Sequence, residues 1–221
     1  PDNRIRNINN EISKLGAVPG NTVNNTREFQ SIQRLLRSLP AAPQTGETRG
    51  QLPGDGQFRR PARPSSRLQM YDGEVLSLRH PDNWRAYESG LGFAVAPEGG
   101  IVGSGNGYSV AYGVIMEVHV PDSGSRSTLT LAEATDQWIA SLRRSNPNMR
   151  LSRDRGRITV GGKPALSKIL TNDSPMGGRE ANWMVTVLHP EGLVSLVFVV
   201  PEGEFSAYEP VFQKMLDSIS F

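Results

Sequence analysis

The chain has 221 residues, of which 24 are Lys or Arg and 22 are Asp or Glu, so its formal net charge is +2. This length suits one ordinary domain with an appendage. The near balance of charge gives no reason to expect a nucleic-acid partner. Hydrophobic residues make up 37% of the chain, yet no stretch approaches the roughly 18 apolar residues of a membrane-spanning helix. The absence of cysteine excludes disulfides, thiolate zinc sites and a cysteine nucleophile.

Residues 1–39 predict a two-helix arm. The segment starts without Met or an apolar signal core, so we expect a piece of something longer. Apolar residues recur at helical spacing on both sides of a Pro19-Gly20 turn. The two stripes contain Ile5, Ile8 and Ile12, then Phe29, Ile32 and Leu36. Two such short helices expose more apolar surface than they can bury on each other, so we expect them to need a partner surface.

Residues 40–66 predict a linker, because Pro, Gly and Arg dominate and no apolar period is present. The one dense basic run of the chain, Phe58–Arg67, lies mostly inside this stretch. We interpret it as a solvated linker and not as a nucleic-acid surface.

Residues 67–221 predict one α+β domain, an antiparallel β-sheet packed by helices. Alternating apolar residues predict a strand in "EVLSLRH" and one long strand over Tyr108–Val120, with Val110, Val114 and Met116 on one face. Gly161-Gly162 suits the tight turn of a hairpin. A further strand pair is joined by residues 189–192, and its second strand is apolar on both faces, as expected of a central strand.

Two helices complete the predicted domain. Thr130 and Glu133 form a capping-box pattern at the start of "LAEATDQWIASLRR". The second helix covers "EFSAYEPVFQKMLDSI", where Ser206 and Glu209 would place Pro210 near the first turn.

The histidines offer the first candidate site. His80 and His189 share one setting, a strand end followed by Pro and an acid. One interpretation is a paired histidine and carboxylate site, and the favoured one is that both are polar residues at strand exits. We interpret His119 as a half-exposed sheet residue. No catalytic or metal-binding residue is assigned.

The Gly99–Gly107 run contains GxGxG, but a strand follows it where a nucleotide loop needs a helix. We expect a loop that enters a hairpin, and whether it covers a ligand stays open. Trp138 and Trp183 are expected in the core. Trp84 follows the turn in "PDNW", which favours an aromatic plug over the sheet edge. The alternative is a partner-binding surface at Trp84 and Tyr87.

"LSLRHPDNW", "ITVGGKPAL" and "FSAYEPVFQKMLDSISF" resemble segments of the PsbP-like family of photosystem II extrinsic proteins and their bacterial relatives. The resemblance covers residues 67–221 and implies an α/β/α sandwich. It also implies a binding or assembly module, because that family shares no catalytic site.

"PDNRIRNINNEI" and "NNTREFQSIQRLLRSLP" resemble the C-terminal tail of HtpX-like HExxH zinc endopeptidases. This resemblance covers residues 1–39 and implies that the HExxH motif and its zinc lie upstream of Pro1. No cofactor is then expected in this chain.

Two functions follow from the resemblances. The first is a non-catalytic C-terminal accessory region of a bacterial zinc-dependent metalloendopeptidase, whose partner is its own upstream domain or another protein. The second is a stand-alone PsbP-like envelope binding protein whose arm docks a partner or forms a homodimer. Both imply the cell envelope, periplasmic or otherwise extracytoplasmic. An enzyme that uses His80 and His189 is a third, less favoured hypothesis.

Overall fold

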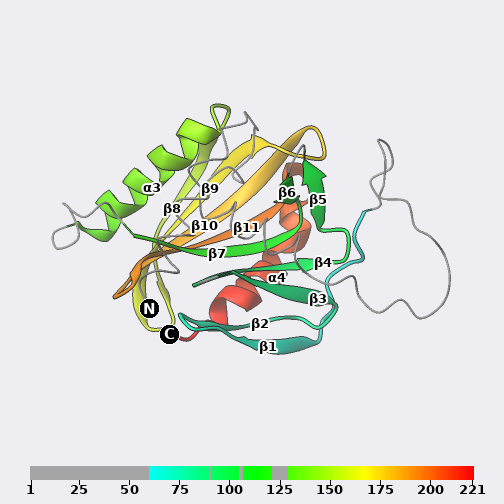
Figure 1. The fold of residues 1–221 in the computed structure, drawn as a ribbon, viewed down its shortest axis with the longest axis horizontal. Helices are drawn as coiled ribbons and strands as arrows, with labels where there is room; N and C mark the ends of the chain where they lie inside the picture. Colours follow the sequence, from blue (N-terminus) through cyan, green and yellow to red (C-terminus); the bar gives the residue numbers. More distant parts are fainter. Residues whose placement is uncertain (1–59, 90, 105–106, 121–128) are drawn as a thin grey trace, which may run out of the picture.

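The computed structural model describes residues 60–89, 91–104, 107–120 and 129–221 (Figure 1). The predicted two-helix arm lies outside these residues. The strands in chain order are β1 (Leu68–Asp72), β2 (Ser77–Pro81), β3 (Trp84–Ser89), β4 (Gly92–Pro97), β5 (Ile101–Ser104), β6 (Gly107–Val110), β7 (Gly113–His119), β8 (Arg150–Val160), β9 (Lys163–Asp173), β10 (Arg179–His189) and β11 (Gly192–Pro201). The helices are α3 (Leu131–Ser145) and α4 (Phe205–Asp217), with the 3-10 turn η2 (Glu202–Glu204) before α4.

Seven strands form one antiparallel sheet in the order β3-β4-β7-β11-β10-β9-β8. Two short ribbons, β1–β2 and β5–β6, lie outside it. Strand β11 sits at the centre between β7 and β10, and it is buried on both faces. The predicted antiparallel sheet and the predicted central strand are therefore confirmed.

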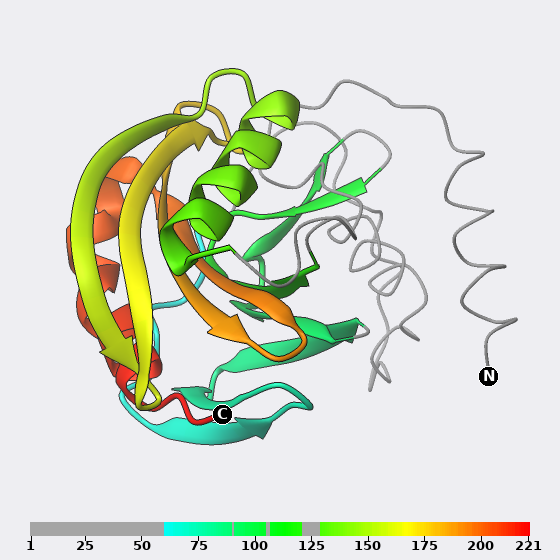
Figure 2. The same ribbon diagram turned by 90° about the vertical axis from the view of Figure 1, so that its left-hand side faces the viewer.

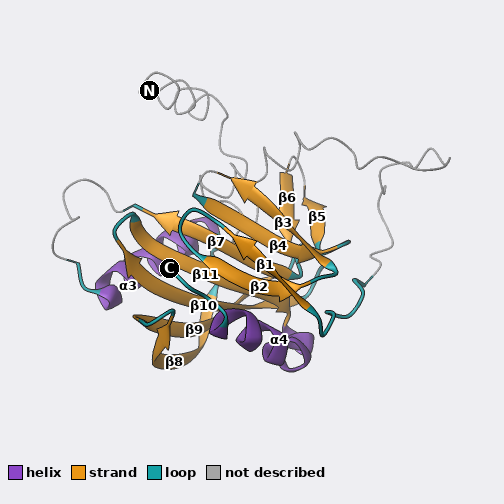
Figure 3. Ribbon diagram, turned by 90° about the horizontal axis from the view of Figure 1, so that it is seen from below, coloured by secondary structure: helices purple, strands orange, loops and turns teal. Residues whose placement is uncertain are grey.

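The two helices pack on opposite faces of the sheet (Figure 2). Trp138 and Leu142 of α3 pack with Met184 on one face. On the other face, Phe212 of α4 packs with Phe198 and with residues of the β1–β2 ribbon. The sheet thus carries an apolar core on each side, and strands make up most of the described chain (Figure 3).

Helix α3 begins where the sequence predicts. Thr130 is the N-cap, its hydroxyl accepts from Glu133 N at 3.3 Å, and its own backbone N donates to Glu133 Oε2 at 2.8 Å. The buried face then bonds to the sheet, since Trp138 Nε1 donates to Ser195 Oγ at 3.1 Å. The capping box is confirmed.

The Gly161-Gly162 hairpin is also confirmed. Both glycines have positive φ angles, 53° and 77°, and they join β8 to β9. Such a turn suits the right-handed twist of the flanking strands, and glycine enters it without steric cost.

The predicted long strand over Tyr108–Val120 is wrong, because the chain bends between β6 and β7. Ala111 N and Tyr112 N both donate to Gly100 O, at 2.8 and 3.1 Å, and Gly113 has φ 150°. Val110 consequently packs on the α3 side of the sheet, whereas Val114 packs on the α4 side. The expected single face is thus divided between two cores.

Three further boundaries differ from expectation. Trp84 is not a plug that follows the last strand residue, because β2 ends at Pro81 and Trp84 itself starts β3 of the main sheet. The Gly99–Gly107 run, expected to be a loop, contains β5 and the first residue of β6. Helix α4 has no side-chain cap, and Pro210 lies inside it. In the first two cases the segment pairs with the strand next to it in the chain, as β3 with β4 and β5 with β6.

Residues 60–66, which the sequence analysis places in the linker, lie against the folded body. Arg60 forms an ion pair with Glu204 at 3.0 Å. Asn83 holds the segment twice, because its Oδ1 accepts from Ser65 N and its Nδ2 donates to Arg63 O, each at 2.9 Å. We call residues 60–66 the strap.

Candidate binding site

A half-open cavity of about 410 Å3 lies between the β1–β2 turn and the β3–β4 edge of the main sheet. This volume is within the usual range of ligand pockets. The cavity is lined by Tyr71, Asp72, Gly73, Glu74, Glu88, Leu91, Gly92, Phe93 and Met116.

The floor of the cavity is apolar. Glu88, Phe93 and Met116 are successive partners across β3, β4 and β7, so they form one row on the α4 side of the sheet. Phe93 and Met116 are both 1% exposed. The Tyr71 ring comes from the β1–β2 ribbon and lies 4.5 Å from the Phe93 ring, centroid to centroid. Of the apolar lining residues, Tyr71 is half-buried and Leu91 is 40% exposed, so an aliphatic group entering the cavity would meet the Tyr71 ring and the Leu91 side chain above this floor.

The rim of the cavity is acidic. Asp72, Glu74 and Glu88 contribute three carboxylates, and no Lys, Arg or His is among the lining residues. Burial and the negative charge of Glu88, to which its hydroxyl is hydrogen-bonded, raise the pKa of Tyr71. The phenol thus stays protonated and donates to Glu88. The cavity therefore has negative charge at its mouth and no internal counter-charge.

The local sequence explains how the ribbon closes over the sheet. Gly73 N donates to Leu76 O at 3.1 Å, which forms the β1–β2 turn. A Cβ at Gly73 would lie 3.0 Å from the Tyr71 ring, so glycine lets the ring fold over the turn. Val75 and Leu76 follow as buried residues and hold the turn in the α4-side core.

This arrangement suits a cation on an aliphatic stem. A positive charge about 4 Å from one carboxylate gains roughly 1 kcal/mol in bulk water and about 4 kcal/mol near a protein surface. It also relieves the mutual repulsion of the three acids. Within the described ranges, no group of three or more His, Cys, Asp or Glu side chains is arranged to hold a metal ion.

The structure places the predicted partner-binding residues apart. Trp84 is 1% exposed and packs edge-on to Phe212, with ring centroids 6.4 Å apart, so its ring belongs to the α4-side core. Tyr87 is half-buried on β3, an edge strand. The arm residues Ile5, Ile8, Ile12, Phe29, Ile32 and Leu36 lie outside the described residues. Trp138 and Trp183 are core residues, as expected.

His80 and His189 belong to different sheets. His80 is 2% exposed on β2, its Nδ1 is hydrogen-bonded to Pro81 O, and burial lowers its pKa. His189 ends β10 and stacks on Phe221, with ring centroids 5.9 Å apart. His119 is half-exposed and stacks on Trp138. Each histidine thus packs against its own neighbours.

Sequence reasoning missed the cavity acids. Asp72 and Glu74 flank a glycine, which is ordinary turn composition, and Glu88 is distant in sequence. The only local signal was the tyrosine beside this acidic turn. Only the pairing of β3 with β4 and the position of the β1–β2 ribbon bring the three carboxylates together.

No protein-family model and no curated protein matches the chain. Among solved structures, it is similar to cyanobacterial PsbP from Synechocystis sp. PCC 6803, at 12% identity and a TM-score of 0.47, covering 77% of this chain and 97% of that one. It is also similar to a Pseudomonas aeruginosa protein of unknown function, at 14% identity and a TM-score of 0.41, covering 68% and 94%.

Proposed function

We propose that this chain is a protein-binding module that takes a lysine or arginine side chain of its partner into the acidic cavity. The observation that carries the proposal is the apolar surface of Tyr71 and Leu91, over the buried floor of Phe93 and Met116, beside a rim of three carboxylates. The aliphatic stem of a basic residue can cover the floor while its charge stays at the rim. The PsbP-like resemblance of residues 67–221 also implies a binding module.

The proposal also concerns the longer protein of which this chain would be a part. The resemblance of residues 1–39 to HtpX-like endopeptidases implies an accessory region of a zinc metalloendopeptidase in the cell envelope, and the alternative is a stand-alone envelope binding protein. In-frame sequencing upstream of Pro1 separates the two. An HExxH motif followed by a Glu ligand supports the first, and a signal peptide that runs into Pro1 supports the second.

A tripeptide titration tests the cavity. We expect acetyl-Gly-Lys-Gly-amide or its arginine counterpart to shift the amide NMR signals of Gly73, Glu74 and Gly92 saturably, and acetyl-Gly-Gln-Gly-amide to leave them in place. Each neutralised carboxylate removes about 1 kcal/mol or more of attraction. The double variant Glu74→Gln/Glu88→Gln should therefore bind the basic peptides roughly 30-fold more weakly, the equivalent of about 2 kcal/mol.

The matched control is Glu98→Gln/Glu191→Gln, which changes the net charge equally at two exposed acids outside the cavity lining. It should bind as the unmodified protein does. Equal shifts with the glutamine peptide, or equal weakening in both double variants, would contradict the proposal.

A further inference from the structure

A second polar cluster lies on the opposite face of the sheet, remote from the cavity. Glu180 and Asn182 are both 1% exposed on β10, and Met184, two residues further, belongs to the α3-side core. Because side chains alternate along a strand, all three face α3. Opposite Glu180 on β9 is Asn172, which is 0% exposed.

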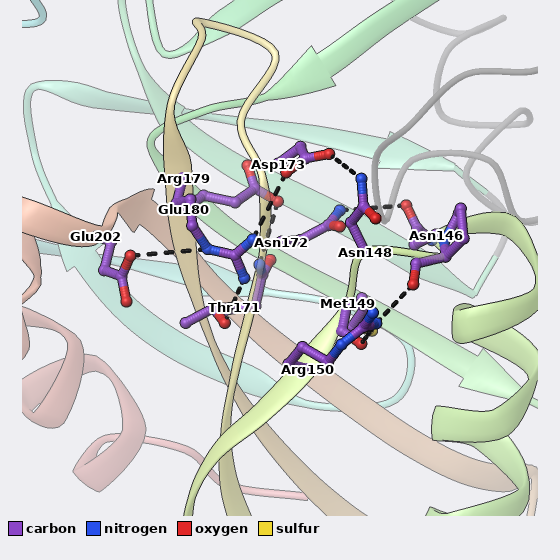
Figure 4. A network of polar contacts seen from close by, with 12 residues as sticks. Asn146, Asn148, Met149, Arg150, Thr171, Asn172, Asp173, Arg179, Glu180 and Glu202 are labelled. Atoms are coloured by element: carbon purple, nitrogen blue, oxygen red, sulfur yellow. Dashed lines mark hydrogen bonds and ion pairs between the residues drawn. The ribbon is translucent and has the colours of Figure 1, made fainter.

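The cluster joins the end of α3 to the β9–β10 hairpin (Figure 4). Asn172 Nδ2 donates to Asn146 Oδ1 at 3.3 Å. Asn146 is the C-cap of α3, and its Nδ2 donates to Leu142 O at 2.8 Å. Glu180 on β10 therefore lies beside Asn172 on β9, whose hydrogen bond to Asn146 anchors the end of this helix.

Glu180 and Asn182 leave two acceptor atoms enclosed. Asn182 Nδ2 donates to Glu180 Oε1 at 3.1 Å. The remaining oxygens, Glu180 Oε2 and Asn182 Oδ1, have no hydrogen-bond partner in the part of the chain that the structure describes. An unpaired buried acceptor costs roughly 1–3 kcal/mol, and an unpaired buried carboxylate costs far more.

The neighbouring cations are engaged elsewhere. The guanidinium of Arg179 has three partners: Thr171 Oγ1 at 2.6 Å, Asp173 at 3.6 Å and Glu202 at 3.9 Å (Figure 4). Arg150 of β8 donates to the carbonyl oxygens of Pro147 and Met149. On α3, the nearest basic side chains in the sequence, Arg143 and Arg144, are exposed.

The negative charge near Glu180 disfavours its ionisation further. Burial raises the pKa of Glu180 to about 8, Asp173 raises it as well, and the hydrogen bond from Asn182 lowers it.

We propose that Glu180 is a neutral carboxylic acid in the folded protein and that its proton bonds to Asn182 Oδ1. One proton then satisfies both enclosed oxygens, because acid and carboxamide form a closed ring of two hydrogen bonds. Removal of the proton leaves two facing acceptors and a buried charge. The junction of α3 with the β9–β10 hairpin is thus a proton-sensitive switch that loosens at alkaline pH.

The sign of the effect follows from linkage. The folded protein holds the proton more tightly than the unfolded chain, in which a glutamate titrates near 4.5. The stabilisation is fully present below that value and is lost as the pH rises toward about 8.

Glu180→Gln tests the proposal, because a glutamine amide can form the same ring with Asn182 and does not titrate. Between pH 6 and 9, we expect the unfolding equilibrium constant of the unmodified protein to rise roughly 10- to 100-fold relative to that of Glu180→Gln. The exposed control Glu191→Gln should keep the full rise. A side-chain carboxyl 13C NMR titration of the unmodified protein should show one glutamate that titrates near 8, and this measurement remains decisive if Glu180→Gln does not fold.

Two results would overturn the switch. The first is a Glu180 carboxyl that titrates below pH 6. The second is a specific salt effect: sodium, potassium or calcium chloride stabilises the unmodified protein, but not Glu180→Gln, more than tetramethylammonium chloride does at equal ionic strength. That result would show that a cation and not a proton fills the site.

Discussion

At the scale of single residues, Gly113 occupies a position where any side chain would clash with the backbone of another strand. It has φ 150°, and a Cβ there would lie 2.3 Å from Val95 O of β4. The bend between β6 and β7 and the approach of β4 both depend on this glycine. Glycine is thus required by backbone conformation and by space at once.

We expect Gly113→Ala to lower the free energy of unfolding by at least about 1–3 kcal/mol, from backbone strain and from the clash with Val95 O. Urea denaturation measures this. Gly103→Ala is the matched control, since a Cβ at Gly103 meets nothing within 4 Å and its φ is not positive. Equal losses in the two variants would show that the β4 contact does not restrict position 113.

At the scale of elements, α3 is defined by its first turn. The carboxylate of Glu133 accepts from both the backbone N and the hydroxyl of Thr130, and these hydrogen bonds lower its pKa. The contribution of this carboxylate is present above the ordinary glutamate range and is lost as the pH falls through the lowered pKa.

Thr130→Ala should destabilise the protein by about 0.5–2 kcal/mol, because the amide of Glu133 loses its capping acceptor. Thermal unfolding near neutral pH measures the loss. Thr130→Ser keeps a hydroxyl and should recover most of the stability. A Thr130→Ser variant as unstable as Thr130→Ala would contradict the capping role.

At the scale of the whole molecule, the strap ties the N-terminal part of the described chain to the body through Asn83 and Glu204. Asn83→Ala removes both side-chain bonds to the strap. We expect amide hydrogen exchange at Ser65 to accelerate roughly 5- to 10-fold, the equivalent of one hydrogen bond of about 1 kcal/mol.

Asp82→Ala is the control for the strap, because Asp82 lies in the same turn and contacts the strap's neighbour Arg67 through its backbone N. Its exchange pattern at Ser65 should match that of the unmodified protein. Unchanged Ser65 exchange in Asn83→Ala would show that Arg60 and packing alone hold the strap.

The sequence by itself determined the features whose signals are local. The Thr130–Glu133 cap, the Gly161-Gly162 turn and the apolar run of β11 each lie within one segment, and each is found where predicted. The prediction of an antiparallel sheet packed by helices follows from the order of the predicted strands and helices along the chain.

Only the tertiary structure decided which segments become neighbours. Gly100 breaks the predicted long strand by accepting from Ala111 and Tyr112. The cavity combines acids from β1–β2 and β3. Glu180 and Asn182 are polar residues in an apolar strand of the sequence. The residues near them in the fold are distant in sequence: Asn146, at the end of α3, precedes Asn182 by 36 residues. Burial and pairing partners are set by strand order and register, which no short stretch of sequence contains.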